Sequence, residues 1–290
     1  AGHAAGKRIP VHIKVDTGME RLGIQPSETP DFLRFIHQLD GIEIRGLMSH
    51  FADAEDPEGN SNNQFGIFLD LVEQLRSQKL LPPLLHCANS GAVLRLPDSW
   101  MNMVRSGILL FGANPDVRGV LDQFEPVMSW TSRIVHINEA EGERSIGYGR
   151  TFQVPERSRV AVIPMGYADG YPRCLSNKAD VLIGGRRAPI VGAVSMDMLT
   201  VLLNHLPNAS VGDEVVLLGM QKKEIITAEE LADLADTVPY EILCGLSRRV
   251  PRLYVEGGRA VRATYPDALF PEGWINSPNV PTDGREEQFT

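Results

Sequence analysis

The sequence predicts an α/β region followed by a mostly antiparallel β domain. Up to about residue 124, apolar strand patterns alternate with amphipathic helical patterns, which is typical of parallel strands joined by crossover helices. Beyond Phe124-Glu125-Pro126 the chain shows short alternating strands separated by Gly, Pro and Asn. We therefore divide it into residues 1–124, residues 125–264 and a loosely attached tail over residues 265–290, which has four prolines and no apolar periodicity.

Four strands are predicted in the first region, each rich in apolar residues and each ending near polar or glycine-bearing residues. They span Val11–Val15, Ile44–His50, Pro83–Asn89 and Met103–Phe111. A helix is expected over Thr29–Leu39, because it opens with an N-cap hydroxyl, a proline and an acid. A second helix is expected over Ser61–Ser77, behind the capping pattern Ser61-x-x-Gln64, and a small one over Gly91–Leu96.

The second region is predicted to be built from short strands with turn residues between them. These strands span Ser132–Asn138, Arg159–Pro164, Asp180–Ile183, Pro189–Val194 and Glu214–Leu218. One substantial helix is expected over Thr227–Ala235, opened by the capping pattern Thr227-x-x-Glu230. Such a pattern favours antiparallel pairing.

Composition excludes several classes of function. The 28 Lys plus Arg and 37 Asp plus Glu give 28 − 37 = −9, without a long basic block, so a nucleic-acid binder is not expected. No apolar run approaches the roughly 18 residues of a membrane span, and no signal-peptide pattern is recognised. The three cysteines lie far apart and are expected to be reduced thiols in a cytoplasmic protein. No metal site is expected.

Four polar clusters follow or end the predicted strands of the first region. They are Lys14 with Arg21, His50, Ala88-Asn89-Ser90 and Arg105-Ser106-Gly107-Ile108. In a parallel α/β barrel the carboxyl ends of the strands form one face, so these clusters are expected to converge there. Cations, a histidine and a small hydroxyl beside a glycine favour an anionic ligand such as a phosphate. Taken singly, each residue is more often a surface charge or a capping group.

Three further motifs lie in the second region: Gly147-Tyr148-Gly149-Arg150, the block Gly166–Arg173, and Ser195-Met196-Asp197. A tyrosine flanked by glycines has little bulk around its ring, so its hydroxyl can be presented to a cleft. The same pattern is equally compatible with a plain turn in which the aromatic ring is an anchor. The eight-residue block from Gly166 is the more informative signal.

Taken together, eight ordered blocks resemble the alanine racemase family. They are Val11–Gly23, Ser49–Ala52, His86–Ser90, Arg105–Ile108, Gly147–Phe152, Gly166–Arg173, Ser195–Asp197 and Arg249–Arg252. The resemblance implies pyridoxal 5′-phosphate as cofactor and a (β/α)₈ barrel followed by a β domain, of which residues 1–124 would supply the last four barrel strands. It also implies a cytoplasmic homodimer whose active site is shared between subunits.

The resemblance assigns roles to the first-region residues. Arg105 would face the pyridine nitrogen of the cofactor, and His50 would bridge Arg105 to the catalytic tyrosine. The phosphate would be held by Ser90, Asn89, Gly107 and Ile108. Arg21 would act near the cofactor's phenolic oxygen and the substrate carboxylate, and Lys14 matches a lysine that is carbamylated in many family members.

In the second region, Tyr148 matches the base that removes or returns the α-proton on one face of alanine. Phenol has a pKa of about 10, so this role requires nearby positive charge. Tyr167 would line the entrance, the amide of Met196 would bind the substrate carboxylate, and Arg248 stands where many members carry a phosphate-binding tyrosine. The implied activity is interconversion of L- and D-alanine, which supplies D-alanine for peptidoglycan.

The block that carries the family's Schiff-base lysine is not found in the sequence. The chain by itself is therefore expected to be an incomplete, inactive portion of the enzyme. Two alternatives stay open: a racemase of broader amino-acid specificity, which Arg248 does not exclude, and a non-catalytic module for dimerisation or ligand binding.

Overall fold

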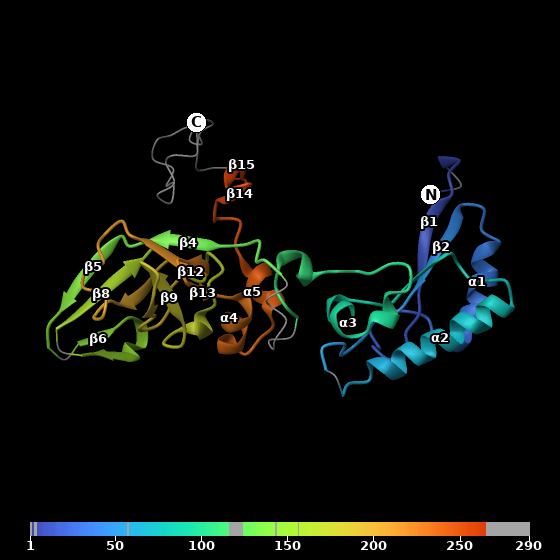
Figure 1. Cartoon of the computed structure of the whole chain (residues 1–290), viewed down its shortest axis with the longest axis horizontal. Coiled ribbons are helices and arrows are strands. Elements are labelled where there is room, and N and C mark those ends of the chain that lie inside the picture. The colour runs from blue at the N-terminus through green and yellow to red at the C-terminus, as the bar shows by residue number, and fades with distance from the viewer. Residues whose placement is uncertain are drawn as a thin grey trace. The chain divides into compact units, whose positions relative to one another are not determined.

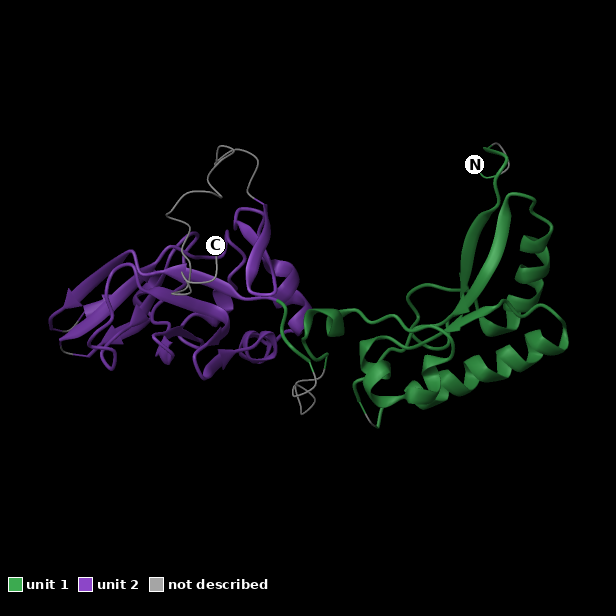
Figure 2. Cartoon of the chain, turned by 45° about the horizontal axis from the view of Figure 1, so that its top comes forward, with its two compact units in different colours: residues 1–127 green, residues 128–290 purple. Residues whose placement is uncertain are grey.

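The chain folds into two compact units, Ala1–Val127 and Met128–Thr290 (Figures 1 and 2). The computed structural model describes residue 2 and residues 5–56, 58–115, 124–142, 144–155 and 157–264. The tail predicted over residues 265–290 lies outside the described residues. The division falls at Val127, whereas the sequence pattern placed it at residue 124. Among the described residues, no helix combines the length and the apolar character needed to cross a membrane.

Unit 1 contains a parallel three-stranded sheet in the order β1-β2-β3 (Figure 1). Its strands are β1 (Ile9–Lys14), β2 (Ile42–Met48) and β3 (Leu84–His86). The crossover connections carry α1 (Thr29–His37), preceded by the 3₁₀ turn η2 (Pro26–Glu28), and α2 (Ser61–Ser77). The alternation of strands and helices in the sequence correctly predicted this parallel arrangement.

Both crossover helices pack an apolar stripe against one face of that sheet (Figures 1 and 2). Leu33 of α1 and Phe68 and Leu75 of α2 are completely buried, as is Leu47 near the carboxyl end of β2. Burying these side chains supplies the main stabilisation of unit 1, because buried apolar area contributes about 25 cal/mol per Å².

The residue Gln64 has a different task from the predicted one. The helix α2 has Asn60, not Ser61, as its N-cap, so the pattern Ser61-x-x-Gln64 does not form a capping box. Instead, the buried Gln64 side chain accepts from the amide of Ala52 at 2.9 Å and donates to the carbonyl of His50 at 3.3 Å. A buried amide must satisfy its donors and acceptors, and the chain that follows β2 offers both.

The prediction of a fourth strand over Met103–Phe111 is wrong. The sheet is followed by α3 (Ser90–Arg95), η3 (Pro97–Trp100) and η4 (Ile108–Phe111), and the last of these is a 3₁₀ turn. Gly107 and the left-handed Gly112 bracket η4, and Leu110 donates to the carbonyl of Gly107 at 3.1 Å. A short apolar run between two glycines is compatible with a tight turn as well as with a strand.

Unit 2 is built from antiparallel strands, as predicted. A five-stranded sheet has the order β10-β9-β12-β13 with β4 also paired to β12, and a three-stranded sheet has the order β11-β8-β5. The strands of these sheets are β4 (Trp130–Arg133), β5 (His136–Ala140), β8 (Ser158–Ile163), β9 (Asp180–Ile183), β10 (Arg186–Pro189), β11 (Leu199–Leu202), β12 (Glu214–Gln221) and β13 (Glu224–Ile226). Two hairpins, β6 (Arg144–Ile146) with β7 (Phe152–Val154) and β14 (Arg252–Glu256) with β15 (Arg259–Thr264), complete the pairing.

The strand predicted over Ser132–Asn138 is in fact two strands. β4 belongs to the five-stranded sheet and β5 to the three-stranded one. Between them Ile134 donates to Asp213 and Val135 donates to Val162, each at 3.0 Å, so the chain leaves one sheet and enters the other. The strand predicted over Pro189–Val194 is likewise displaced, because β10 ends at Pro189.

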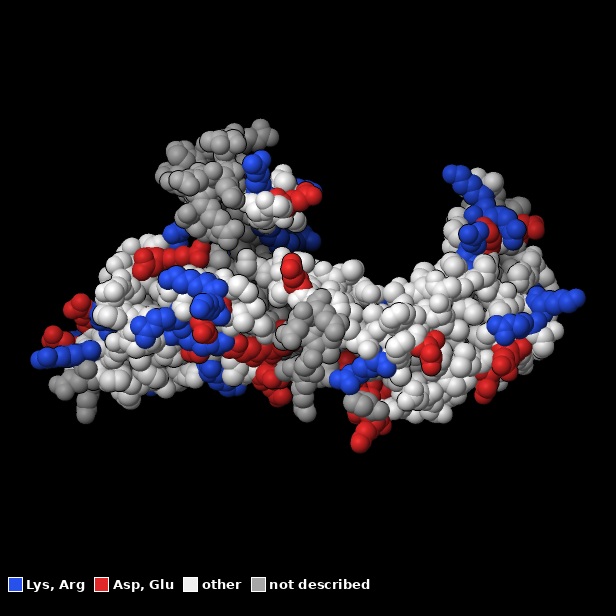
Figure 3. Space-filling view, in the orientation of Figure 1, with Lys and Arg blue, Asp and Glu red and all other residues white. Residues whose placement is uncertain are grey.

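Helix α4 (Ala228–Ala235) confirms the prediction from its capping pattern. The Thr227 hydroxyl accepts from the amide of Glu230 at 3.1 Å. A second helix, α5 (Pro239–Gly245), was not predicted, although it begins with a proline. The interior strand β12 is buried over Val215–Leu218, so both of its faces are covered. Basic and acidic side chains are interspersed on the visible surface (Figure 3).

Replacing Leu47 by Ala is expected to lower the free energy of unfolding of unit 1 by about 2–5 kcal/mol, because it leaves a cavity in the core. Hydrogen exchange of the β1–β3 amides and urea unfolding measure the change. Leu69→Ala is the matched control, since Leu69 lies on α2 with 39% of its side chain exposed. Equal effects of the two substitutions would contradict the assignment of Leu47 to the core.

Candidate active site

The guanidinium of Arg105 is the centre of the polar cluster in unit 1. Its Nη2 donates to the carbonyls of Ser49 and Cys87 at 2.9 and 3.0 Å, and lies 3.1 Å from His50 Nδ1. Its Nη1 lies 2.7 Å from His86 Nδ1 and donates to the His86 carbonyl at 3.3 Å. Arg105 therefore ties together the carboxyl ends of β2 and β3, as the convergence argument predicted.

These contacts determine the protonation of both histidines. A guanidinium has donors only, so the Nδ1 atoms of His50 and His86 must be acceptors, and in each neutral ring the hydrogen is on Nε2. His86 Nε2 then donates to His12 Nδ1 across 2.6 Å. Burial, followed by the charge of Arg105, lowers the pKa of His50 and of His86 from 6.5 to about 4, so both rings are neutral at physiological pH.

One donor of Arg105 is left over. Among the described residues, every acceptor of Arg105 is contacted by one of its two terminal nitrogens, Nη1 or Nη2. Its Nε–H contacts no acceptor there. Burial lowers the pKa of Arg105 below its ordinary value, but an arginine still keeps its proton in proteins. The site thus offers one fixed N–H donor that does not transfer its proton.

The turn after β1 is held by a buried carboxylate. Asp16 Oδ1 accepts from three successive amides at 2.9–3.1 Å, those of Gly18, Met19 and Glu20. Burial alone would raise the pKa of Asp16, but the three amides together hold it below its ordinary value. Arg21 follows this turn, and its side chain is exposed. The turn lies at the carboxyl end of β1, and Arg105 contacts the carboxyl ends of β2 and β3 of the same sheet.

Lys14 is the last residue of β1, and its ammonium donates to the carbonyl of Leu22. Burial lowers the pKa of Lys14. The charge of Asp16 opposes this shift, and those of Arg21 and Arg105 add to it. The amine is therefore easier to deprotonate than that of an exposed lysine.

The segment that follows Arg105 is bonded to the start of α3. The buried Ser90 Oγ accepts from the amide of Gly107 at 2.9 Å, and Ile108 begins the next turn, η4. A Cβ on Gly107 would lie 3.6 Å from Ser90 Oγ, an ordinary van der Waals distance, so the space at this position would admit a small side chain. Asn89 is the N-cap of α3 and accepts from Ala92 at 3.0 Å, which occupies its side-chain oxygen.

In unit 2, the loop that carries Tyr167 lies against the turn that carries Met196. Tyr167 donates to the carbonyl of Ser195 at 3.0 Å, and Ala168 donates to that of Met196 at 2.8 Å. Tyr167 and Met196 are both exposed, at 44% and 55%. Arg248 is also exposed and follows Ser247, which donates to the carbonyl of Asp169 at 2.9 Å. Three of the predicted residues are therefore brought onto connected segments.

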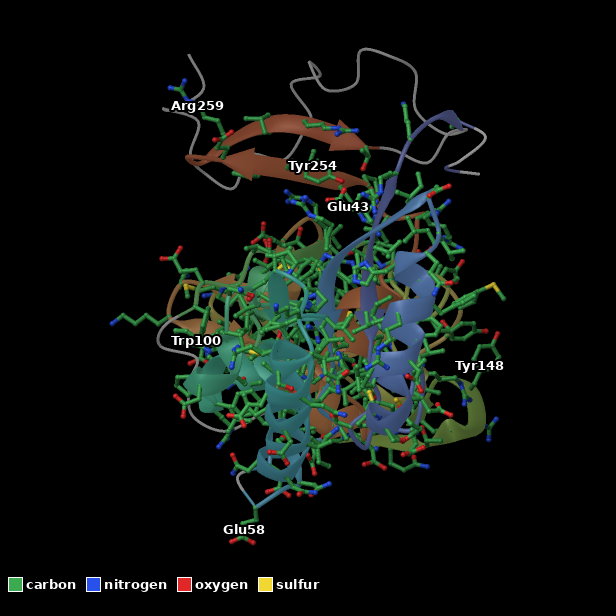
Figure 4. All side chains as sticks on the ribbon, turned by 90° about the vertical axis from the view of Figure 1, so that its right-hand side faces the viewer. Glu43, Glu58, Trp100, Tyr148, Tyr254 and Arg259 are labelled. Carbon is green, nitrogen blue, oxygen red and sulfur yellow. The ribbon has the colours of Figure 1, made fainter. Side chains whose placement is uncertain are left out.

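Tyr148 stands apart from those segments. It begins the 3₁₀ turn η6 (Tyr148–Arg150), after Gly147 at φ 71°, and is 75% exposed. Its ring projects away from the ribbon of its own segment (Figure 4). The ring of Tyr148 is therefore exposed on the surface of unit 2 and is not packed as an aromatic anchor of the turn.

No role was predicted for His86 or His12. Their positions in the sequence could have indicated one. His12 and Lys14 are two positions apart on β1 and so share a face of the sheet, and His86 ends β3 in the way that His50 follows β2.

Titration of the ring nitrogens by NMR is expected to show His50 and His86 neutral down to about pH 4. Because their folded-state pKa values are below 6.5, the unfolded chain binds more protons between pH 6.5 and 4. Stability is therefore present above pH 6.5 and falls as the pH falls through that window. In Arg105→Gln both rings are expected to titrate at higher pH than in the unchanged protein, because the charge of Arg105 is removed. Unchanged titration in that variant would show that Arg105 does not contribute to the lowered pKa values.

Comparison with known proteins identifies the family of the chain. Residues 1–115 match the family described as "Alanine racemase, N-terminal domain", and residues 127–254 match "Alanine racemase, C-terminal domain". Alanine racemase of Halothermothrix orenii is 42% identical over 247 residues, which are 84% of this chain and 65% of that protein. The enzyme of Symbiobacterium thermophilum is 44% identical over 257 residues, 87% of this chain and 68% of that one.

Solved structures agree. Alanine racemase from Bacillus anthracis, with bound L-Ala-P, superposes with a TM-score of 0.80 at 32% identity over 89% of this chain and 68% of that one. The enzyme from D-cycloserine producing Streptomyces lavendulae gives 0.84 at 31% identity, over 88% of this chain and 69% of that one. The chain spans about two thirds of the length of these relatives. It belongs to the alanine racemase family.

Proposed function

We propose that the protein containing this chain interconverts L- and D-alanine with pyridoxal 5′-phosphate as cofactor. The observation that carries the proposal is the guanidinium of Arg105, which two neutral histidines and three carbonyls hold, while its Nε–H has no acceptor among the described residues. When bound, the cofactor withdraws electrons from the α-carbon of the amino acid and so lowers the cost of removing its proton.

The residues of unit 1 fit this cofactor. The free Nε–H of Arg105 suits the pyridine nitrogen as an acceptor, and since arginine does not give up its proton, that nitrogen stays unprotonated. Ser90, Gly107 and Ile108 are proposed to hold the phosphate: the Ser90 hydroxyl accepts from the Gly107 amide and keeps its own O–H to donate, and backbone amides beside a glycine can approach an anion closely. Asn89 supports them by capping α3, and Arg248 of unit 2 is a further candidate for phosphate contact.

Arg21 and the amide of Met196 are proposed to hold the carboxylate of alanine, and Tyr167 to line the entrance. Lys14 is proposed to be carbamylated. Carbamylation requires a neutral amine, and the lowered pKa of Lys14 favours it. It would turn a cation into an anion beside Arg21.

Tyr148 is proposed as the base on one face of the substrate. His50 accepts from Arg105 through Nδ1, so its Nε2–H is the group that would donate to the phenol oxygen. In the proposed homodimer, this contact joins Tyr148 of one subunit to His50 of the other. The reduced state of Cys87, Cys174 and Cys244 supports a cytoplasmic location.

Ser90→Ala is expected to weaken pyridoxal phosphate binding by about 10- to 100-fold, because it removes a hydrogen bond to a charged group worth about 1.5–3 kcal/mol. Fluorescence titration measures the affinity. Ser99→Ala is the matched control, since Ser99 is also buried and bonds only the carbonyl of Leu96 among the described residues, at 2.7 Å. An affinity for Ser90→Ala equal to that of the control would refute the phosphate assignment.

Tyr148→Phe is expected to lower kcat for racemisation in both directions by about 10²- to 10⁴-fold, with a small change in KM, because it removes a base but keeps the ring. Polarimetry with L- and D-alanine follows the reaction, and a panel of other amino acids measures the specificity. Tyr254→Phe is the control, since Tyr254 lies on the exposed hairpin β14–β15 (Figure 4). Activity of Tyr148→Phe within about threefold of the control would exclude this role.

A further inference from the structure

Asp169 is a buried carboxylate in unit 2 that the roles above do not use. It is 7% exposed and lies in the block Gly166–Arg173. Its Oδ2 accepts from the amide of Gly166 at 2.9 Å, and its Oδ1 lies 3.1 Å from Arg249 Nε. Each oxygen of Asp169 therefore has its own partner: Oδ2 has a hydrogen bond from the loop itself, and Oδ1 has an ion pair with a segment 80 residues away (249 − 169 = 80).

The loop around Asp169 fits tightly against the turn that carries Met196. A Cβ on Gly166 would lie 2.3 Å from the Ser195 carbonyl oxygen, so only glycine permits the contact. Two backbone hydrogen bonds, from Tyr167 and Ala168, then join the loop to Ser195 and Met196. A shift of the loop would move Tyr167 and the Met196 turn relative to each other.

The same loop is joined to the segment that carries Arg248. Ser247 donates to the Asp169 carbonyl at 2.9 Å, and a Cβ on Gly170 would lie 2.2 Å from the Gly245 carbonyl oxygen. Arg249 closes this connection through its side chain. Asp169 is thus the point where the segments that carry Tyr167, Met196 and Arg248 meet.

A charge-assisted contact is suited to this task. The Asp169 side chain is 10% exposed and that of Arg249 is 54% exposed, so the carboxylate is shielded while the guanidinium reaches it from the surface. The attraction between opposite charges is stronger where one of them is shielded from water, so this ion pair can hold the two segments together.

We propose that Asp169 and Arg249 are a positioning pair, which sets the Met196 amide and Tyr167 in the geometry that binds the substrate carboxylate. This inference rests on the proposed function for its substrate. That the pair fixes the positions of the Tyr167 and Met196 segments is a statement about this chain alone and does not depend on the substrate.

The test uses Asp169→Asn, Arg249→Met and Arg249→Lys in the whole protein. In Asp169→Asn the remaining side-chain oxygen can still accept from the Gly166 amide, but the N–H₂ group then faces Arg249 and the ion pair is lost. Glu230→Gln is the matched control. It weakens another ion pair of unit 2, with Arg187 at 2.5 Å, that bonds none of the three segments.

Asp169→Asn and Arg249→Met are expected to raise KM for alanine by about tenfold with kcat within about threefold, because a carboxylate contact is made equally in the ground and transition states. Arg249→Lys, which keeps the charge, is expected to be intermediate. In ¹⁵N–¹H spectra recorded without substrate, the amide signals of Tyr167, Ala168 and Met196 are expected to move in these variants and to stay in place in Glu230→Gln.

The proposal is overturned if the three amide signals stay in place in Asp169→Asn and Arg249→Met, or if Glu230→Gln raises KM equally. Should Asp169→Asn lose its folded circular-dichroism spectrum, the two Arg249 variants decide. If the wild-type protein shows no racemisation, the proposed function fails. In that case the amide signals of Tyr167, Ala168 and Met196 alone test whether the pair fixes these segments.

Discussion

The arrangement of unit 1 depends on the half-buried cation of Arg105. Taking a charge out of water is costly unless its hydrogen bonds are satisfied. In the described part of the chain, every acceptor of Arg105 is neutral, either a backbone carbonyl or an imidazole nitrogen. These acceptors lie at the ends of β2 and β3 and in the residues that follow them, so the guanidinium also holds the two strand ends together.

The same requirement explains the chemistry of the neighbouring groups. Since Arg105 only donates, His50 and His86 can only accept from it, and their rings remain neutral beside a positive charge. Gln64 then anchors the chain after His50 from the side of α2, through the amide of Ala52 and the carbonyl of His50. A cation with one free donor, flanked by neutral rings, suits an acceptor nitrogen in a ligand better than it suits a second cation.

Unit 2 positions its candidate residues by different means. There the close approach of backbone segments depends on glycines, at Gly166 and Gly170, where any side chain would overlap a carbonyl oxygen. The buried carboxylate of Asp169 fixes the segments that this approach brings together. At Gly147 a glycine has a different effect. Its positive φ turns the chain just before Tyr148, whose phenol is exposed.

By itself, the sequence determined the alternation of strands and helices in unit 1, the antiparallel strands of unit 2, the cap of α4 and the chemical types of the candidate residues. These follow from local periodicity and local hydrogen bonding, which neighbouring residues decide. Only the tertiary structure decided that Met103–Phe111 ends in a 3₁₀ turn, that Gln64 anchors the His50 segment, and that His86 and His12 extend the contacts of Arg105. The reason is physical: Arg105 and His50 are 55 residues apart, and the direction of a hydrogen bond is fixed only when the fold brings a donor and an acceptor together.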